Sequence, residues 1–550
     1  MSKKYLQIHP KDNVLAALTD LSKGTSIDHN GSEFTLTSDT QAKHKFTVER
    51  LNVGDEIIMY GTLVGKATKP IAQGETITME NVVHASMEYA VGNEKLSWEA
   101  PEVSQWKDRT FNGYHRADGS VGTANYWLII PMVFCENRNV EVMKSALLKS
   151  LGYHTTTDFI VDTDSLVERY KNGASENEIL DSDIIRTPED IKQNRTFPNV
   201  DGIKFLTHEG GCGGFRLDSE TLCNLFAGYI TNSNVAGATI LSLGCQNAEV
   251  KNLEKGIKER DPNFSKPLYI LEQQKSESER HFIEEAVKKT FLGLIEANKI
   301  ERQPAPLNHL VLGLECGGSD GFSGISANPT LGRVSDVLSA LGGSPILSEF
   351  PELCGVEQEL MDRCVDNEKA DKFIRLMKAY EQSAIDAGSG FDMNPSPGNI
   401  KDGLITDAMK SAGAAKKGGT SPVADVKDYA EYVTEPGLNL LCTPGNDVES
   451  TTGLVGSGAN VVLFTTGLGT PTGNPIAPVI KVSSNTKLAT EMSDIIDFDT
   501  GAVIRGEKSI EQTGDELLNF IIEVASGCIT AKADQLGQDD FIPWKRGVSL

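Results

Sequence analysis

Apolar runs that end abruptly in glycine-rich turns recur along this chain of 550 residues. The clearest covers residues 310–314 and breaks into Glu315, Cys316 and two glycines. Short runs rich in leucine and β-branched residues, bounded by glycine, predict buried parallel strands. From Phe111 onward such runs alternate with helical patterns, for example at 276–297, and this alternation predicts parallel or mixed sheets covered by helices.

Residues 1–92 carry a different pattern, in which short alternating runs are separated by Gly, Asn and Asp turns. They predict a small β-rich domain, with one helix expected at 10–21. Residues 93–110 are polar and aperiodic and predict a linker. Near 298–306, charged residues and prolines interrupt a helical stretch and indicate a second boundary. The expected fold class is α/β, with a small β-rich domain at 1–92, a linker at 93–110, and two α/β domains with parallel or mixed sheets at 111–305 and 306–550.

Composition narrows the class of protein. A hydrophobic content of 39% and a charged content of 23% are typical of a globular protein, and the length favours several domains. No apolar run approaches the ~18 residues of a membrane span, and the first residues lack the apolar segment of a signal peptide. We therefore expect a cytoplasmic protein with no membrane partner and with reduced cysteines. The formal net charge of -25 argues against nucleic acid as a partner.

Four of the nine cysteines stand where a predicted strand gives way to a loop, and they are Cys135, Cys212, Cys245 and Cys316. The carboxyl ends of parallel strands meet at one sheet edge, where ligands bind. His208 precedes a glycine run four residues before Cys212. Thiolates and imidazoles suit iron, so these five residues are candidate ligands of one iron ion or of an iron–sulfur cluster. Two alternatives remain open: thiols packed as small hydrophobes, or a mononuclear site of His and carboxylates.

Several long motifs resemble the altronate/galactarate dehydratase family, and the resemblance covers nearly the whole chain. The motifs are KHKFTV (43–48), GYHRADGSVGTANY (113–126), HEGGC (208–212), SLGC (242–245), GLECGGSDGFSGISANPTLGRVSD (313–336), NPSPGN (394–399), PGLNLLCTPGND (436–447) and TTGLGTPTG (465–473). The N-terminal domain resembles the SAF (β-clip) domain that this family carries in front.

The resemblance implies a hydro-lyase that removes water from a sugar acid. The expected reaction converts D-altronate to 2-dehydro-3-deoxy-D-gluconate in galacturonate catabolism, with Fe²⁺ as cofactor and Mn²⁺ as a substitute. We also expect a homo-oligomer, in the form of a dimer. Galactarate dehydratase and sulfolactate lyase are alternatives within the family. An alternative of another class is a non-catalytic sugar-acid binding or assembly protein, because SAF-like domains also occur in such proteins.

Dehydration next to a carboxylate needs a base at the C2 proton and an acid at the leaving hydroxyl. A divalent metal stabilises the aci-carboxylate that forms. The candidate acids and bases are His44, His208, Glu209, Glu315 and Asp320, of which His44 rests on the family match alone. The candidate substrate ligands are Lys45, Arg116, Arg333, Asn328, Asn394, Asn399, Asn446, Asp447 and Thr466, with Arg216 and Lys401 as further cations. Arg333 is the preferred partner of the substrate carboxylate. Through His44 and Lys45, the N-terminal domain is expected to close over the site.

Overall fold

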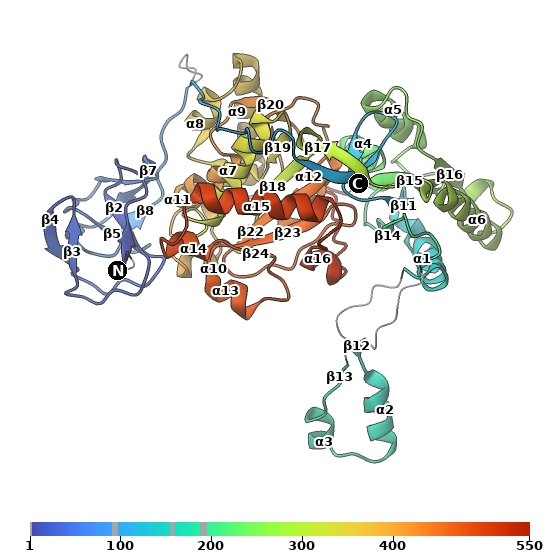
Figure 1. Cartoon of the computed structure of the whole chain (residues 1–550), viewed down its shortest axis with the longest axis horizontal. Coiled ribbons are helices and arrows are strands. Elements are labelled where there is room, and N and C mark those ends of the chain that lie inside the picture. Colours follow the sequence, from blue (N-terminus) through green and yellow to red (C-terminus); the bar gives the residue numbers. More distant parts are fainter. Residues whose placement is uncertain (1–2, 91–96, 154–159, 187–194, 550) are drawn as a thin grey trace.

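The computed structural model describes residues 3–90, 97–153, 160–186 and 195–549. A strand-rich N-terminal lobe and a smaller α/β body lie on opposite sides of a large α/β body formed by the C-terminal half (Figure 1). The linker predicted at 93–110 lies partly outside the described residues. From residue 97 to Arg109 it contains no helix or strand, and it runs along the large body, where Arg109 donates to Asn519. Within the described residues, no helix is both long and apolar enough to cross a membrane.

The N-terminal lobe is built from small antiparallel sheets, in the orders β1-β2-β5, β3-β4 and β6-β7-β8. The helix predicted at 10–21 is wrong, because Val14–Ala17 form strand β2, which pairs with β1 and β5. All four residues of β2 are buried, and periodicity cannot tell so short an apolar run from a buried helical turn. The strands are β1 (Tyr5–Leu6), β2 (Val14–Ala17), β3 (Ser26–His29), β4 (Ser32–Thr35), β5 (Lys45–Thr47), β6 (Glu56–Met59), β7 (Thr62–Ala67) and β8 (Val82–Val83).

The large body contains a seven-stranded sheet in the order β20-β21-β19-β18-β22-β23-β24, in which every neighbouring pair is parallel. This confirms the parallel sheet predicted from buried apolar runs. Its strands are β18 (Val311–Cys316), β19 (Ser344–Leu347), β20 (Val423–Lys427), β21 (Leu438–Leu441), β22 (Val461–Thr466), β23 (Val479–Ser483) and β24 (Phe498–Asp499). Its α-helices are α7 (Ala327–Ala340), α8 (Glu357–Asp362), α9 (Asn367–Asp386), α10 (Pro397–Lys401), α11 (Asp407–Ala414), α12 (Asp447–Gly456), α13 (Thr486–Glu491), α14 (Gly501–Ile504), α15 (Ile510–Ala525) and α16 (Lys532–Gln535), and its 3-10 turns are η4 (Phe350–Leu353), η5 (Phe391–Met393) and η6 (Ala415–Gly418).

Alternate residues of the central strand β22 serve two different cores. Val461 and Leu463 pack into the core that α7 and α15 cover, whereas Val462 and Phe464 pack into the core on the opposite face. This follows from the two-residue period of a strand, and burial on both faces explains why the strand is apolar throughout.

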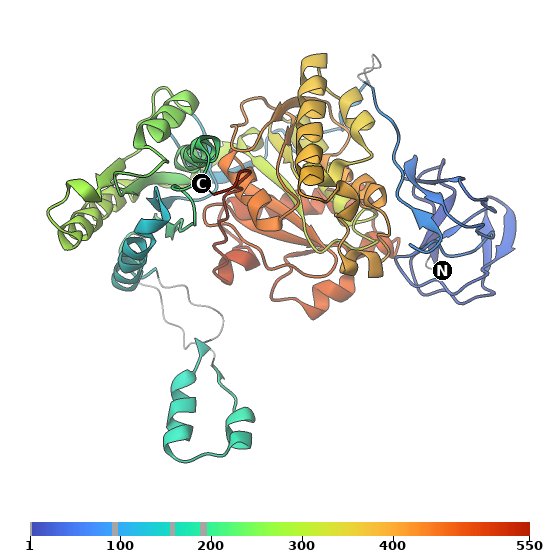
Figure 2. The same ribbon diagram turned by 180° about the vertical axis from the view of Figure 1, so that it is seen from behind.

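The smaller body holds a four-stranded parallel sheet in the order β14-β11-β15-β16. Its elements are β11 (Tyr126–Pro131), η1 (Phe134–Glu136), α1 (Asn137–Leu151), β14 (Gly202–Phe205), α4 (Arg216–Thr231), β15 (Val235–Ser242), α5 (Val250–Arg260), β16 (Leu268–Glu272), η2 (Gln273–Lys275) and α6 (Glu279–Ala297). An antiparallel ribbon joins the two bodies, made of β9 (Thr110–His115), β10 (Val121–Gly122), β17 (Gln303–Pro306) and the turn η3 (Leu307–His309). A separate arm, β12 (Ile160–Val161), α2 (Thr163–Lys171), α3 (Glu176–Leu180) and β13 (Ile185–Arg186), stands away from both bodies (Figure 2).

The two α/β bodies meet where helix α4 crosses α12. A Cβ atom added to Gly228 would lie within 2.8 Å of the Gly456 carbonyl carbon, so only glycine permits this backbone approach. We expect Gly228→Val to push the helices apart and to lower the free energy of unfolding by about 1–3 kcal/mol. Chemical denaturation measures this change. Glu220→Ala, at an exposed position of the same helix, should stay within about 0.5 kcal/mol of the native protein, and equal effects of the two substitutions would contradict the prediction.

Candidate active site

The candidate active site lies at the carboxyl edge of the seven-stranded sheet. From β18 the chain adds β19 on one side of that strand, and later adds β22 on the other side. This change of direction makes a topological switch point between β18 and β22, the place where open α/β sheets bind ligands. The loop after β18 closes against the loop after β22, since Gly467 and Leu468 both donate backbone N–H groups to the Gly318 carbonyl.

A buried cluster of thiol, carboxyl and ammonium groups occupies this edge. The Lys417 ammonium donates to Cys316 Sγ at 2.8 Å and to Glu349 Oε2 at 2.6 Å. The Cys316 thiol donates to Glu352 Oε2 at 3.0 Å, and Glu352 Oε1 pairs with Lys410 Nζ at 2.7 Å. All five side chains are buried, so these contacts act with little screening by water.

The carboxyl groups of this cluster differ in the direction of their pKa shifts: the pKa values of Glu315 and Glu349 are raised, and that of Glu352 is lowered. Burial raises the pKa of Glu315 well above its ordinary value, with the Glu349 charge adding to the effect, so this site favours the protonated carboxyl group. Burial also raises the pKa of Glu349, more than Lys417 lowers it. For Glu352, burial opposes ionisation, but the charges of Lys410 and Lys417 prevail and lower the pKa. Neighbouring carboxyl groups with opposite shifts can divide acid and base roles between them.

The same cluster could hold a metal ion. One ligand atom each from Cys316, Glu349 and Glu352 lies within 4.8 Å of the other two. The carboxyl groups of Glu315 and Glu349 are hydrogen-bonded to each other, and apart from that contact their Oε1 atoms have no partner in the described part of the chain. A thiol with two carboxylates is a donor set that fits a divalent transition metal, and a bound metal would deprotonate the thiol. In the chain without metal, the Lys417 ammonium supplies the positive charge beside Cys316 and Glu349.

Asp447 lies beside the cluster, at the start of α12. It is half-buried, and a Cβ atom added to Gly317 would meet its carboxylate Oδ2, so the loop after β18 passes directly beside it. Burial raises the pKa of Asp447 to about 7, with the charges of Glu349 and Glu352 adding to the effect. The neighbouring Asn446 is exposed and caps the helix through the backbone N–H groups of Val448 and Glu449.

Asn394 contacts one of the buried lysines of the cluster. Its Oδ1 accepts from Lys410 Nζ at 2.6 Å, the same ammonium that pairs with Glu352. A Cβ atom on Gly445 would come within 3.1 Å of Asn394 Nδ2. Asn394, Asn446 and Asp447, three of the residues predicted to bind hydroxyl groups, therefore lie beside the cluster.

The N-terminal lobe docks on this edge through residues next to the predicted His44 and Lys45. The salt bridge to Asp320 comes from Lys43, at 3.1 Å, and Lys43 also reaches Asp402 at 3.2 Å. Lys45 is buried and donates to the Gly403 carbonyl at 2.7 Å. Burial lowers the pKa of Lys45 to about 7, although the Asp320 charge opposes the effect. The lobe thus reaches the sheet edge.

His44 itself faces a hollow of the N-terminal lobe that Asp39, Lys69 and Glu75 also line. It is half-buried, and burial lowers its pKa. Asp320 is fully buried, where its Oδ1 accepts from Ser323 and Ser484 and its Oδ2 faces Lys43. The structure therefore brings Asp320 to the sheet edge, while His44 lies on the lobe beside it.

Other predicted substrate ligands are bound within the protein. Arg116 is buried in a turn and donates to the carbonyls of Ser233 and Ala124. Arg333, the preferred carboxylate partner, pairs with Asp515 at 3.2 Å. The side chains of Asn328, Asn399 and Thr466 are buried and hydrogen-bonded within the protein. Asn328 bonds the Gly413 carbonyl and the Thr465 hydroxyl, and Asn399 donates to the Ser319 carbonyl. Thr466 accepts from the Gly469 N–H. The exposed Arg216 and Lys401 lie outside the cluster, and the substrate roles of all these residues stay predictions.

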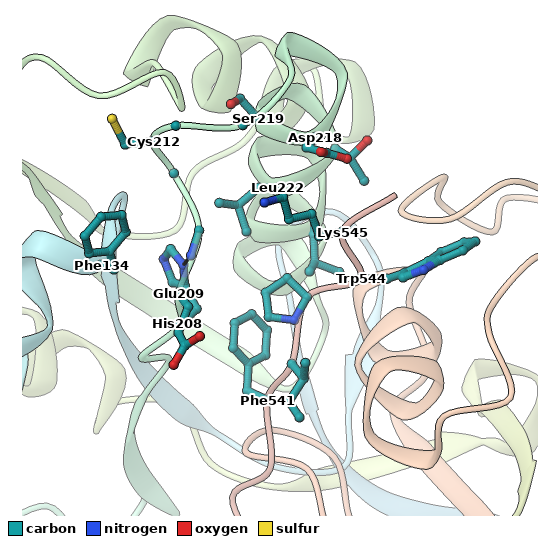
Figure 3. Close-up of a pocket in the computed structure, with 18 of the residues that line it drawn as sticks. Phe134, His208, Glu209, Cys212, Asp218, Ser219, Leu222, Phe541, Trp544 and Lys545 are labelled. Atoms are coloured by element: carbon teal, nitrogen blue, oxygen red, sulfur yellow. Dashed lines mark hydrogen bonds between the residues drawn. The ribbon is translucent and has the colours of Figure 1, made fainter. Parts of the chain in front are cut away.

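The structure separates the predicted metal ligands into two places. Cys316 lies in the cluster of the large body, whereas Cys135, Cys212 and Cys245 are exposed on loops at the carboxyl edge of the four-stranded sheet. A cavity of about 940 Å³ opens beside these loops and is lined by His208, the exposed Glu209 and Cys212 (Figure 3).

His208 is buried at that second edge and is held by both ring nitrogens. Its Nε2 bonds the Pro131 carbonyl at 2.7 Å, and its Nδ1 accepts from the Gly210 N–H at 2.9 Å. Burial lowers the pKa of His208 to about 4, so the ring is neutral. These bonds tie the glycine turn to β11, and the predicted ligand and acid–base roles of His208 stay predictions.

Sequence reasoning missed four members of the cluster, namely Glu349, Glu352, Lys410 and Lys417. The two glutamates had a usable signal, since they follow the apolar run of β19 as the strand-end cysteines follow theirs. The two lysines had none, because they stand on α11 and η6, and only the tertiary fold brings these elements over the strand ends.

The fold and the site together define a multidomain α/β enzyme with a carboxyl–thiol–lysine centre at a switch point. Three family models match the chain: an altronate/galactarate dehydratase SAF domain at residues 3–85, the second domain of D-galactarate dehydratase/altronate hydrolase at 113–298, and the C-terminal domain of D-galactarate/altronate dehydratase at 307–549. The chain belongs to the altronate/galactarate dehydratase family.

Curated relatives extend over almost the whole chain. It is 33% identical to an altronate dehydratase of Bacillus subtilis, over 96% of this chain and 95% of the relative. It is 32% identical to an altronate dehydratase of Escherichia coli, over the full length of both. A galactarate dehydratase (L-threo-forming) of Escherichia coli is 30% identical over 97% of this chain and 95% of that protein.

Proposed function

We propose that the protein is a hydro-lyase that dehydrates a sugar acid, with D-altronate as the preferred substrate and 2-dehydro-3-deoxy-D-gluconate as the product. Two relatives that match nearly the full chain are altronate dehydratases, and this similarity supports the substrate. The observation that carries the proposal is the buried Cys316–Glu349–Glu352 group at the carboxyl edge of the seven-stranded sheet, with the half-buried Asp447 beside it.

Asp447 is the proposed base that takes the C2 proton. Its pKa of about 7 lets it accept a proton at neutral pH, and its half-buried position leaves it within reach of a substrate. Glu352 is kept ionised by Lys410 and Lys417, so it does not compete as an acid. Glu315, whose pKa is raised by burial, is the proposed source of the proton for the leaving hydroxyl. Asn394 and Asn446, which lie beside the cluster, are suited to bind and orient substrate hydroxyl groups.

We assign the divalent metal, Fe²⁺ with Mn²⁺ as a substitute, to Cys316, Glu349 and Glu352. When bound there, it would supply a Lewis acid for the carboxylate and 2-hydroxyl of the substrate. The chain itself contributes the two ammonium groups of Lys410 and Lys417, which offset the charges of Glu352 and Glu349 at this site.

A substrate panel tests the proposal. Purified anaerobically with Fe²⁺, the protein should form a 2-keto-3-deoxy acid from D-altronate faster than from galactarate, and sulfolactate should release no sulfite. Faster turnover of galactarate would overturn the substrate and leave the reaction class standing. Binding of sugar acids without any dehydration product would favour the non-catalytic alternative.

Glu349→Gln gives the site-specific arm of this experiment. It should abolish product formation, because it removes one of the proposed metal ligands. Glu516→Gln changes an exposed glutamate that pairs with Lys508 on the surface and should leave the rate unchanged. We also keep the expectations of a cytoplasmic location and of a homodimer, the latter measurable by light scattering.

A further inference from the structure

Three thiols gather at the edge of the four-stranded sheet, away from the proposed active site. Cys135 follows β11, Cys212 follows β14 and Cys245 follows β15, and these three strands are neighbours in the sheet. All three thiols are exposed, whereas Cys223, Cys316, Cys364 and Cys442 are buried. Because the strands are parallel, their carboxyl ends bring the three loops to one side.

Backbone contacts tie the three loops together. Phe134, next to Cys135, donates its N–H to the Gly210 carbonyl at 3.1 Å, and Ala248 donates to the Gly211 carbonyl at 3.0 Å. Gly213, next to Cys212, donates to Asn247 Oδ1 at 3.1 Å.

The glycine turn that carries Cys212 is also shaped by this packing. Gly211 has a φ of +96°, and a Cβ atom there would lie 2.2 Å from the Met132 carbonyl oxygen. The loop is therefore built to lie against the Cys135 segment, and Figure 3 shows Cys212 and Phe134 on the same side of the cavity.

The three thiols are too far apart to bind one metal ion together. The three sulfur atoms do not all lie within 4.8 Å of one another, as ligands of one ion would. An iron–sulfur cluster places its ligands on different iron atoms and so spreads the thiolates more widely. His208 cannot serve as a further ligand without breaking its bonds to Pro131 and Gly210.

The same edge contains polar atoms that lack a partner. Glu136 Oε1 and Asn137 Oδ1 are buried and accept no hydrogen bond from the described residues, and they belong to the two residues that come after Cys135. Burying an unsatisfied acceptor costs about 1–3 kcal/mol, so these atoms indicate that a cation or donor belongs at this edge. At Cys245, Gln274 Nε2 approaches the sulfur at 3.3 Å, a contact of the kind that tunes cluster thiolates.

We propose that Cys135, Cys212 and Cys245 bind a 4Fe–4S cluster. Three thiolates leave one iron without a protein sulfur ligand. Cys135, Cys212 and Cys245 would hold such a cluster, and its remaining iron would offer a site for an oxygen ligand; a cavity of about 940 Å³ adjoins Cys212. Exposed iron–thiolate centres oxidise readily, so the cluster is lost in air.

Reconstitution of the full chain tests this assignment. Treated anaerobically with ferrous and ferric iron, sodium sulfide and dithiothreitol, and then desalted, the protein should retain about four iron and four acid-labile sulfide per chain, with broad visible absorption. Cys135→Ser, Cys212→Ser and Cys245→Ser should each lose most of the sulfide while the unfolding midpoint stays unchanged.

Two matched thiols serve as controls. Cys528→Ser changes another exposed cysteine, and Cys316→Ser changes the thiol of the proposed active site, and both should keep the sulfide at the native level. Iron uptake without sulfide by the native protein would overturn the proposal. So would a native content of sulfide in a variant in which Cys135, Cys212 and Cys245 are all changed to serine. Iron and sulfide contents are measured without any assay of dehydratase activity. The proposed function and the proposed cluster are therefore tested independently, and either can be wrong while the other is right.

Discussion

Lys417→Met is expected to unfold the protein more easily and to abolish its activity. The ammonium of Lys417 is buried and bonds both Cys316 and Glu349, so its loss leaves carboxyl groups without a counter-charge. Breaking a buried ion pair from one side costs about 3–5 kcal/mol. Chemical denaturation should report that loss, and turnover of D-altronate should fall by about 100-fold or more.

A double variant separates the structural from the functional role of Lys417. Lys417→Met with Glu349→Gln removes both charges of the pair, so the free energy of unfolding should recover most of its native value. Activity should not recover, because the proposed metal ligand Glu349 is then also absent. Recovery of turnover in the double variant would contradict a catalytic role for the cluster. Lys508→Met, which breaks an exposed pair, should change stability by less than about 1 kcal/mol.

Asp447→Asn is expected to lower kcat while making the fold more stable at high pH. As the proposed base, Asp447 must be ionised, so kcat/KM of the native protein should rise with pH and then level off, at a pH below about 7 because a metal bound to Glu349 and Glu352 lowers the pKa of Asp447 from its value in the metal-free chain. The amide cannot accept the C2 proton, and the rate should fall by about 10²–10⁴-fold. Rates measured between pH 5 and 9, about two units to each side of this pKa, check both statements.

The ionisation of Asp447 has opposite effects on the rate and on the stability: the rate rises with pH, whereas the free energy of unfolding falls. The pKa of Asp447 is raised in the folded chain, through burial and the charges of Glu349 and Glu352, against the opposing charges of Lys410 and Lys481. The folded state therefore holds this proton more tightly than the unfolded state, and stability falls as pH rises from about 4 through about 7. Asp447→Asn should abolish this part of the decline. Reduced stability at pH 8 together with an unchanged pH–rate profile would contradict the assignment.

Much of the fold follows from local sequence pattern. Buried parallel strands are apolar on both faces, so hydrophobicity and glycine alone predict the four strands β11, β14, β15 and β18, which precede the strand-end cysteines. The strand-end rule also placed Cys316 and Asp320 at the carboxyl edge of a sheet. The rule failed at Val14–Ala17, where an apolar run of four residues has no period that separates a strand from a helix.

The sequence by itself thus determined the α/β class, the β-rich N-terminal lobe, the family, and the loops in which reactive side chains gather. Only the tertiary structure divided the four strand-end cysteines between two sheets, because strand order is not encoded in the strands' own pattern. It also brought Lys410 and Lys417 from α11 and η6 to Glu352 and Glu349. Ion pairs between residues far apart in sequence depend on how helices pack over strand ends, and no local periodicity records that packing.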